Sequence, residues 1–457
     1  MSVLSGQIES VRTSMPYGVV GQVEAISGLT IEAAGLPLAL GALCRIKSFG
    51  GQRSLAEVIG FRGEHTLLMA LSPPRGVARR DRVENVTTSP QMWCSGGLLG
   101  RVLNGYGEPI DGKGRLVLCE PRRIDGRGAA PLTRRGIDEP MVTSIRAIDG
   151  LHTCGKGQRM GIFSGPGVGK STLIAQIARY SSAEVSVIAL VGERGREVQD
   201  FLTNALGAEG LKRCVLIVST SDDPPLLRVR AVRTAATVCE HFREQGKDVL
   251  FLLDSLTRMC QAQRQIGLAA REPPATKGFP PSVFALLPEI LERAGKTDRG
   301  SITGFYSVLV EADDFNEPIA DAVKGLVDGH VWLSRSLANR GHFPAVDVLQ
   351  SISRVRGDVV GSDQLGAAKR VLGLMAIYQD IEDLVNIGAY VPGTNGEFDL
   401  AVQSRPRIMQ FLQQEPTNPA TLEQSKKQLM ELVAWIEQMD KSLRAQAAKS
   451  AGRVSAR

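Results

Sequence analysis

The sequence predicts an α/β protein in which a central parallel-sheet domain follows a small N-terminal β-barrel and precedes a C-terminal helical domain. Short apolar runs between glycine and proline turns fill the first part of the chain. In the middle, uniformly apolar runs alternate with helical patterns, and beyond Gly361 apolar residues recur at three- and four-residue spacing. We therefore place the domains at residues 1–90, 91–360 and 361–457.

Composition bounds the class of protein. The 457 residues are too many for one hydrophobic core, and 43% hydrophobic with 22% charged residues is ordinary globular composition. We find no apolar run approaching the roughly 20 residues of a membrane helix and no signal peptide, so we expect a cytoplasmic protein. The seven cysteines are scattered without a Cys-x-x-Cys pair, which favours reduced thiols over disulfides or zinc. A net charge of +6 fits an anionic partner, or solubility alone.

The N-terminal region shows the pattern of a small β-barrel. Its β-type runs are separated by turn residues, and they lie at 19–26, 29–33 and 56–61. Residues 98–114 are dense in turn residues, and the proline- and arginine-rich stretch 121–135 is typical of a connector.

The middle of the chain has the pattern of strands buried on both faces, which indicates a parallel sheet covered by helices. The expected strands are 185–191, 215–219, 249–253, 301–310 and 330–333, with a long helix at about 226–243. After Gly361 we expect helices at 367–384, 401–413 and 421–439. A frayed basic tail should follow from Lys441.

A phosphate-binding loop is predicted at the centre of the chain. The apolar run Arg159–Ser164 reads as a strand, Gly165-Pro166-Gly167-Val168-Gly169 as a loop, and the residues from Lys170 as a helix. Backbone N–H groups of such a loop surround a polyphosphate, the lysine reaches the β and γ phosphates, and Ser171 holds magnesium. Ser164 stands where the strict pattern has glycine; the alternative is an ordinary glycine turn.

Carboxylates and an arginine follow other expected strands. Asp254 ends the run 249–254, where a carboxylate binds magnesium through water. Glu193, in Gly192-Glu-Arg-Gly-Arg-Glu197, is placed to orient and deprotonate an attacking water, although the segment also fits a surface charge cluster. Arg354 lies beyond the last expected strand, from where it could reach the nucleotide of a neighbouring copy.

Several motifs together resemble the hexameric ATPases of flagellar and type III secretion export. They are Gly-Pro-Gly-Val-Gly-Lys-Ser, Gly-Glu-Arg-Gly-Arg-Glu, Leu252-Leu-Asp-Ser-Leu-Thr-Arg258, Glu272-Pro-Pro-Ala-Thr-Lys-Gly-Phe-Pro-Pro-Ser-Val-Phe284 and Pro344-Ala-Val-Asp347 with Ser351-Ile-Ser-Arg354. The resemblance covers about residues 15 to 415, and the family is similar in turn to the subunits of rotary ATP synthases. It implies a ring-forming barrel, a RecA-like ATPase domain and a helical domain that faces substrates and chaperones.

The resemblance also implies roles for individual residues. Lys170 grips the phosphates within a nucleotide-binding loop that runs from Gly165 through Thr172. Ser171 and Asp254 serve Mg²⁺, the aspartate through water. Glu193 is the catalytic carboxylate, supported by Arg194, with Arg258 lining the same pocket. Arg354 is the arginine finger supplied in trans by the adjacent subunit, and Phe343 stacks on adenine.

The partners implied by the resemblance are those of an export machine. They are five further copies in a homohexamer, a stator-like regulatory protein at the extreme N-terminus, export chaperones, unfolded export substrates and a membrane export gate. The ATPase is then cytoplasmic and peripherally associated with the inner-membrane export apparatus, with no specific nucleic acid. The segment before Met15 is shorter than in many flagellar members.

Other functions remain as alternatives at this stage. An injectisome ATPase differs little from a flagellar one. The segment Ala275-Thr276-Lys277 favours the flagellar ATPase by resemblance. A rotary ATP synthase subunit should carry an acidic torque-bearing segment, and none is seen. A ring-shaped RNA translocase needs stacking aromatics near its N-terminus, where only Tyr17, Phe49 and Phe61 occur. A noncatalytic nucleotide-binding subunit is disfavoured because one chain carries both proposed carboxylates together with the lysine and the finger arginine.

Overall fold

The computed structural model describes residues 18–72, 74–87, 90–310 and 317–454, with side chains described up to residue 446. The segment before Met15, where regulator binding is expected, and the last three residues lie outside the described part. The chain forms two compact units. The first comprises the described residues within 1–135, 184–309 and 315–326, and the second those within 136–183, 310–314 and 327–457.

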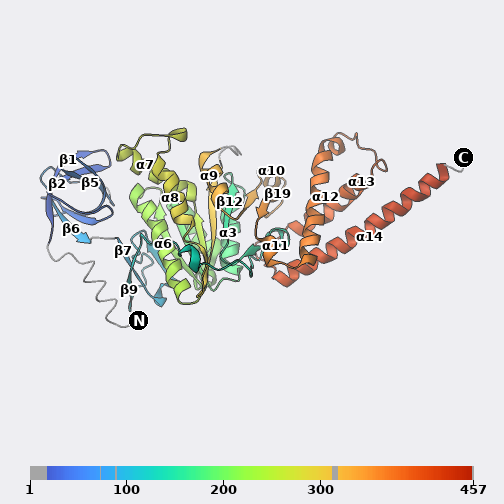
Figure 1. Ribbon diagram of the computed structural model, residues 1–457, viewed down its shortest axis with the longest axis horizontal. Helices are drawn as coiled ribbons and strands as arrows, with labels where there is room; N and C mark the ends of the chain where they lie inside the picture. The colour runs from blue at the N-terminus through green and yellow to red at the C-terminus, as the bar shows by residue number, and fades with distance from the viewer. Residues whose placement is uncertain (1–17, 73, 88–89, 311–316, 455–457) are drawn as a thin grey trace. The chain divides into compact units, whose positions relative to one another are not determined.

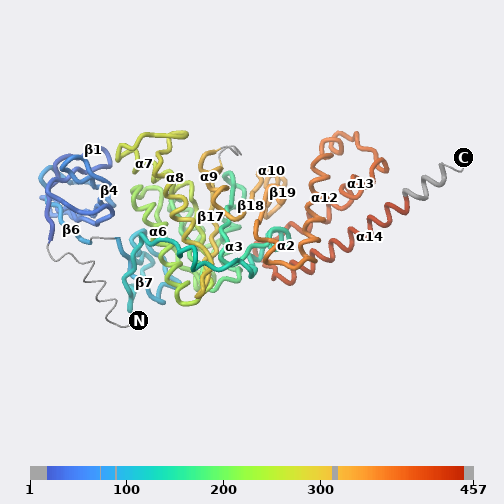
Figure 2. The backbone as a smooth tube through the Cα atoms, viewed as in Figure 1, coloured from blue at the N-terminus to red at the C-terminus, as the bar shows by residue number. Residues whose placement is uncertain are grey.

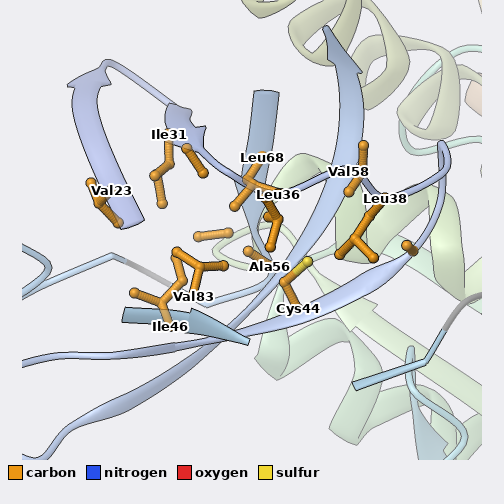
Figure 3. Packing of buried hydrophobic residues seen from close by; sticks show 13 residues of the cluster. Val23, Ile31, Leu36, Leu38, Cys44, Ile46, Ala56, Val58, Leu68 and Val83 are labelled. Atoms are coloured by element: carbon orange, nitrogen blue, oxygen red, sulfur yellow. The ribbon is translucent and has the colours of Figure 1, made fainter. Parts of the chain in front are cut away.

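The N-terminal β-barrel is confirmed as a closed six-stranded barrel (Figure 1). Its strands close in the order β1-β2-β5-β4-β3-β6, and β1 pairs antiparallel with both β2 and β6. Side chains alternate between the barrel interior and the outside, so the interior is filled by residues such as Val23, Ile31, Ile46 and Leu68 (Figure 3). The strand bounds are β1 Val20–Ser27, β2 Thr30–Ala34, β3 Leu43–Lys47, β4 Arg53–Arg62, β5 His65–Ala70 and β6 Arg82–Thr87.

The segment after the barrel is more ordered than its turn-rich sequence indicates. β7 (Gln91–Cys94) pairs antiparallel with β9 (Glu120–Arg123), which overlaps the start of the expected connector. Between them, after the single turn η1 (Gly96–Leu98), β8 (Val102–Asn104) joins the edge of the parallel sheet beside β14. The Arg101 guanidinium holds Asp111 through two hydrogen bonds of 2.7 and 2.9 Å, and this ion pair fixes the turns that follow β8.

The first unit contains the parallel strands predicted from the apolar runs. They lie in the order β17-β15-β13-β14-β8, and β16 (Gly295–Lys296) pairs antiparallel with β17. Eight of the nine residues of β13 are buried, because helices such as α6 cover the sheet. The bounds are β13 Val185–Glu193, β14 Cys214–Thr220, β15 Asp248–Asp254 and β17 Ser301–Leu309. The helical segments are α4 Gly195–Asp200, η3 Phe201–Leu206, α5 Gly207–Leu211, α6 Pro225–Glu244, α7 Leu256–Ala269, η4 Thr276–Gly278, α8 Pro281–Leu291 and α9 Pro318–Leu326, and η2 Pro131–Thr133 lies earlier in the chain.

The second unit holds the predicted phosphate loop between β12 (Arg159–Ser164) and α3 (Lys170–Tyr180). β18 (Gly329–Leu333) pairs parallel with β12 on one side and antiparallel with β19 on the other. The expectation that the sheet ends before the Ser351-Ile-Ser-Arg354 motif is wrong, because β19 spans Val346–Ser353 and Arg354 follows it directly. The remaining short elements are β10 Pro140–Met141, α2 Arg146–Leu151, β11 Cys154–Gly155, α10 Arg335–Asn339 and α11 Arg356–Val359.

The C-terminal helices are confirmed, with longer bounds than predicted. They are α12 Ser362–Asn386, α13 Gly396–Leu412 and α14 Leu422–Val454, and each packs against the other two (Figure 2). The expected helix end at Met439 is wrong, since α14 continues through the basic segment. Arg444 supports this extension by pairing with Asp440 one turn earlier, at 2.9 Å. Among the described residues, no helix has both the length and the apolar character that a membrane span requires.

Candidate active site

The phosphate loop has the backbone geometry that its glycines predict. Gly167 and Gly169 adopt φ values of 76° and 87°, in the left-handed region that favours glycine, and α3 begins at the next residue, Lys170. Ser164, the departure from the strict pattern, is fully buried, and its carbonyl accepts a 3.0 Å hydrogen bond from the Val310 N–H. The loop therefore keeps its turn with serine at the end of β12, and the buried Ser164 hydroxyl has no hydrogen-bond partner among the residues that the structure describes.

A cavity of about 850 Å³ extends from this loop within the second unit. Phe343 lies beside the loop, with two ring atoms 3.4 Å from the position that a Cβ of Gly169 would take. The Phe343 side chain is 44% exposed, so an apolar ring face is available to a ligand. Besides the loop and Phe343, the lining includes one face of α3 and the end of α13 with its following segment, contributed by Thr172, Leu173, Gln176, Gln410, Gln413, Gln414, Glu415, Pro416 and Asn418.

The far wall of the cavity is fixed by Gln414, a residue that the sequence did not single out. Its Nε2 donates to the carbonyls of Ser144 and Asn418 at 2.8 and 2.9 Å, and its Oε1 accepts from the Arg146 N–H at 2.8 Å. Its backbone N–H also donates to the Phe343 carbonyl at 3.0 Å. Gln414 thus ties the segment after α13 to α2 and to the aromatic residue, and only the fold reveals this.

The first unit brings two of the predicted carboxylates to one sheet edge. β13 and β15 are parallel neighbours, with Leu190 opposite Asp254, so both strands end toward the same edge at Glu193 and Asp254. Ligands of open parallel sheets bind at this carboxyl edge. Asp254 is 3% exposed, and the Ser307 hydroxyl of β17 donates to its Oδ1 at 2.7 Å. Ser307 orients the carboxylate, and no motif in the sequence points to this role.

Glu193 and Arg194 sit where β13 turns into α4. A side-chain hydrogen bond with Glu193 lowers the pKa of Glu197, the acidic residue of the first turn of α4. The Arg194 backbone N–H also donates to Glu197 Oε2 at 3.3 Å, while the Arg194 side chain is largely exposed. Glu197 therefore holds the turn that presents Glu193 and Arg194, and it was visible in the sequence only as the end of the motif.

Arg258 approaches this turn from α7. A Cβ on Gly192 would lie 2.9 Å from the Arg258 Cβ, and Gly192 has a φ of 74°, so both space and backbone conformation require glycine there. Arg258 therefore packs against the backbone that directly precedes Glu193, inside the first unit. In the sequence, Gly192 is recognisable only as part of a motif.

Arg354 follows β19 directly, and its side chain is exposed. Its backbone N–H donates to the Asp328 carbonyl at 2.9 Å, and the preceding Ser353 hydroxyl donates to the Thr153 carbonyl at 2.9 Å. The backbone at the end of β19 is therefore anchored, while the guanidinium extends from the surface of this unit. An arginine finger needs this combination of fixed backbone and accessible charge.

A strand, a glycine loop and a helix in this geometry, with carboxylates ending neighbouring parallel strands, define a phosphate-loop nucleotide-binding protein. Family models match three segments of the chain, which correspond to the barrel, the nucleotide-binding region and the C-terminal helices. Residues 144–353 match the nucleotide-binding domain of the ATP synthase alpha/beta family, 23–86 match its β-barrel domain, and 360–431 match the C-terminal domain of the type III secretion ATPase EscN.

Individual relatives match almost the whole chain. The flagellum-specific ATP synthase of Bacillus subtilis is 48% identical over 420 residues, covering 92% of this chain and 96% of the relative. The type 3 secretion system ATPase of Sinorhizobium fredii is 44% identical, covering 92% of each chain. Among solved structures, assembled EscN of enteropathogenic Escherichia coli has a TM-score of 0.86 at 42% identity, covering 90% of this chain and all of that one.

The chain belongs to the ATP synthase alpha/beta family, in the group of flagellar and type III secretion export ATPases. It is accordingly an ATP-hydrolysing enzyme of type III protein export. The match of the C-terminal region to the EscN model favours this group over the rotary ATP synthases.

Proposed function

We propose that this chain is the ATPase that powers protein export by the bacterial flagellum. The observation that carries the proposal is the phosphate loop with its adjoining cavity, in a chain whose C-terminal helices match an export-specific domain. The flagellar assignment is supported by the relatives from Bacillus subtilis and Treponema pallidum, at 48% and 49% identity. The injectisome ATPases, at 44% for the Sinorhizobium fredii protein, define the second candidate.

In the proposed mechanism, residues of the phosphate loop bind and orient the nucleotide. Backbone N–H groups from Gly165 to Gly169 and the start of α3 surround the phosphates, and the Lys170 ammonium neutralises the β and γ oxygens. Thr172 faces the cavity one residue beyond Ser171, and Phe343 stacks on the base. The aromatic ring needs no hydroxyl for stacking, because the contact is made by its face.

Mg²⁺ is the cofactor that the proposed mechanism calls for. The ion prefers oxygen ligands and keeps several waters, and the chain offers the hydroxyl of Ser171 at the start of α3 and the oriented carboxylate of Asp254. Ser171 would bind the ion directly and Asp254 through water. When bound, Mg²⁺ neutralises charge that develops on the phosphate oxygens.

The chemical step is assigned to Glu193. Its carboxylate orients a water molecule and accepts a proton as that water attacks the γ phosphorus, while Arg194 supports the carboxylate. Glu197 supports this role by accepting a hydrogen bond from the Arg194 backbone N–H at 3.3 Å, which holds the turn that presents the base.

We also propose the assembly and partners of an export motor. EscN has been solved in assembled form and with its central stalk EscO, and this chain resembles those structures at TM-scores of 0.86 and 0.83. A homohexamer would let Arg354 act in trans on the neighbouring nucleotide. The further proposed partners are a stator-like regulator, export chaperones and unfolded substrates, with peripheral association at a membrane export gate.

Replacing the phosphate-binding lysine tests the proposed function. We expect Lys170→Ala to weaken ATP binding about tenfold or more, because a charge-assisted contact to the phosphates is lost. Nucleotide binding is measured by calorimetry on the purified proteins, and export by the amount of flagellar protein secreted from cells that carry only the variant. Arg179→Ala, on the same helix but in its last turn, is the matched control.

Secretion should fall sharply for Lys170→Ala and stay near normal for Arg179→Ala. If cells that carry Lys170→Ala secrete flagellar proteins normally but no longer secrete injectisome substrates, the chain is an injectisome ATPase, the second candidate. Normal ATP binding by Lys170→Ala would contradict the nucleotide site itself.

A further inference from the structure

The wall of the nucleotide cavity contains a buried amide without a partner. Gln176 lies on α3 and lines the cavity together with Thr172 and Leu173, at spacings that place all three on one helix face. Its side chain is 4% exposed, and its Nε2 has no hydrogen-bond partner among the residues that the structure describes. Burying an amide donor in this way costs free energy unless a ligand supplies an acceptor.

Gln414 shows that buried amides in this cavity wall are not generally left without hydrogen-bond partners. Both glutamines are more than nine-tenths buried and line the same cavity, yet Gln414 uses both its Nε2 hydrogens and its Oε1 in contacts of 2.8 to 2.9 Å. Gln410 and Gln413 are exposed, so water satisfies their amides. Gln176 alone among these four glutamines is both buried and left with an unused donor.

The position of Gln176 indicates which part of a nucleotide it meets. Gln176 lies six residues beyond Lys170, or about 9 Å along the helix axis at the rise of an α-helix. Phosphates bind at the N-terminus of α3, and Phe343 lies against the loop at Gly169. Because Phe343 is proposed to stack on the face of the base, the part of the cavity farther along α3 is left for the hydrogen-bonding edge of that base.

We propose that the Gln176 carboxamide recognises the adenine base and so selects ATP over GTP. With the carboxamide turned toward the cavity, its Nε2 donates to a ring nitrogen while its Oε1 accepts from the exocyclic amine, a two-bond pairing that amide side chains make with adenine. Guanine carries a carbonyl oxygen in place of that amine, so the same pairing fails. This inference rests on the proposed function, because it names the base that the phosphate-loop site takes.

The test compares the triphosphates of both purines with a ligand that has no base. Calorimetry gives the affinities of ATP, GTP and inorganic tripolyphosphate, each with Mg²⁺, for the full-length protein and for Gln176→Met, whose side chain has similar length without polar atoms. We expect the ATP preference over GTP to fall about tenfold, the loss of one base-reading pair. Tripolyphosphate affinity should not change, and the melting temperature without ligand should not fall, because an unpaired buried group has been removed.

Two further variants make the outcome decisive. Gln410→Met removes an exposed amide from the same cavity and should leave the ATP preference intact, and Gln176→Leu repeats the test if the methionine variant melts early. The inference is overturned if the wild type does not prefer ATP, if the Gln176 variants keep the wild-type preference, or if Gln410→Met loses it equally. If the wild type binds neither triphosphate nor tripolyphosphate, the proposed function itself fails, and that result is distinct from the others.

Discussion

Glu193→Gln is expected to bind Mg·ATP normally while hydrolysis falls by about 10² to 10⁴, the range that general-base catalysis contributes. The amide has the same shape as the carboxylate and can still hydrogen-bond to Glu197, so the turn between β13 and α4 should persist. It cannot accept the proton of the attacking water. The measurement pairs nucleotide affinity with phosphate release under single-turnover conditions, which separates the chemical step from product release.

The control is the same chemical change on the surface of the first unit. Glu209 on α5 is 81% exposed and pairs with Lys212 at 2.8 Å, so Glu209→Gln should alter neither affinity nor rate. Hydrolysis by Glu193→Gln within a few-fold of wild type would remove Glu193 from the mechanism. Loss of nucleotide affinity in the same variant would instead give this residue a binding role.

The phosphate-loop region could be predicted because its signals are local. β12 and the start of α3 lie where the apolar run and the Gly-Lys-Ser sequence place them, and β15 ends at the predicted Asp254. Strands buried on both faces have continuous apolar runs, which need no knowledge of distant contacts. The carboxyl-edge residues follow from the same logic, since parallel strands end at one edge.

The strands that were missed lack such a signal. β8 has three residues within a turn-rich stretch, and its place is set by pairing with β14, more than 100 residues later. β19 is antiparallel, and exposed positions interrupt its burial pattern. Its sequence therefore alternates in polarity and resembles a loop followed by a motif. Strand pairing decides both cases, and pairing partners cannot be read from a single segment.

The supporting residues of the site were missed for a related reason. Gln176, Gln414 and Ser307 are recognised by what surrounds them: a cavity wall, three carbonyl or amide partners, and an aspartate on a neighbouring strand. Glutamine and serine are common, and their spacing carries no information about such contacts. By contrast, Glu193 and Lys170 lie in dense motifs whose chemistry is visible in the sequence.

Catalytic activity is expected to depend on assembly, because Arg354 is proposed to complete the site of the neighbouring subunit. The anchored end of β19 and the exposed guanidinium support this role. Arginine fingers contribute about 10³ to 10⁵ in rate. Hydrolysis per subunit should therefore rise steeply with protein concentration as rings form, and Arg354→Ala should assemble and bind ATP yet remain slow. Arg340→Ala, an exposed arginine on the segment after α10, is the control.

Mixing two inactive variants tests whether Arg354 acts across the subunit interface. Lys170→Ala retains its finger but lacks a working phosphate loop, whereas Arg354→Ala retains the loop but lacks the finger. In mixed rings some interfaces join an intact loop to an intact finger, so hydrolysis should rise above that of either parent, by an amount set by the mixing ratio. If mass measurements show mixed rings and their activity stays at the level of the parents, Arg354 either serves its own subunit or acts only in rings with every site intact. Both results would contradict a finger that works one interface at a time.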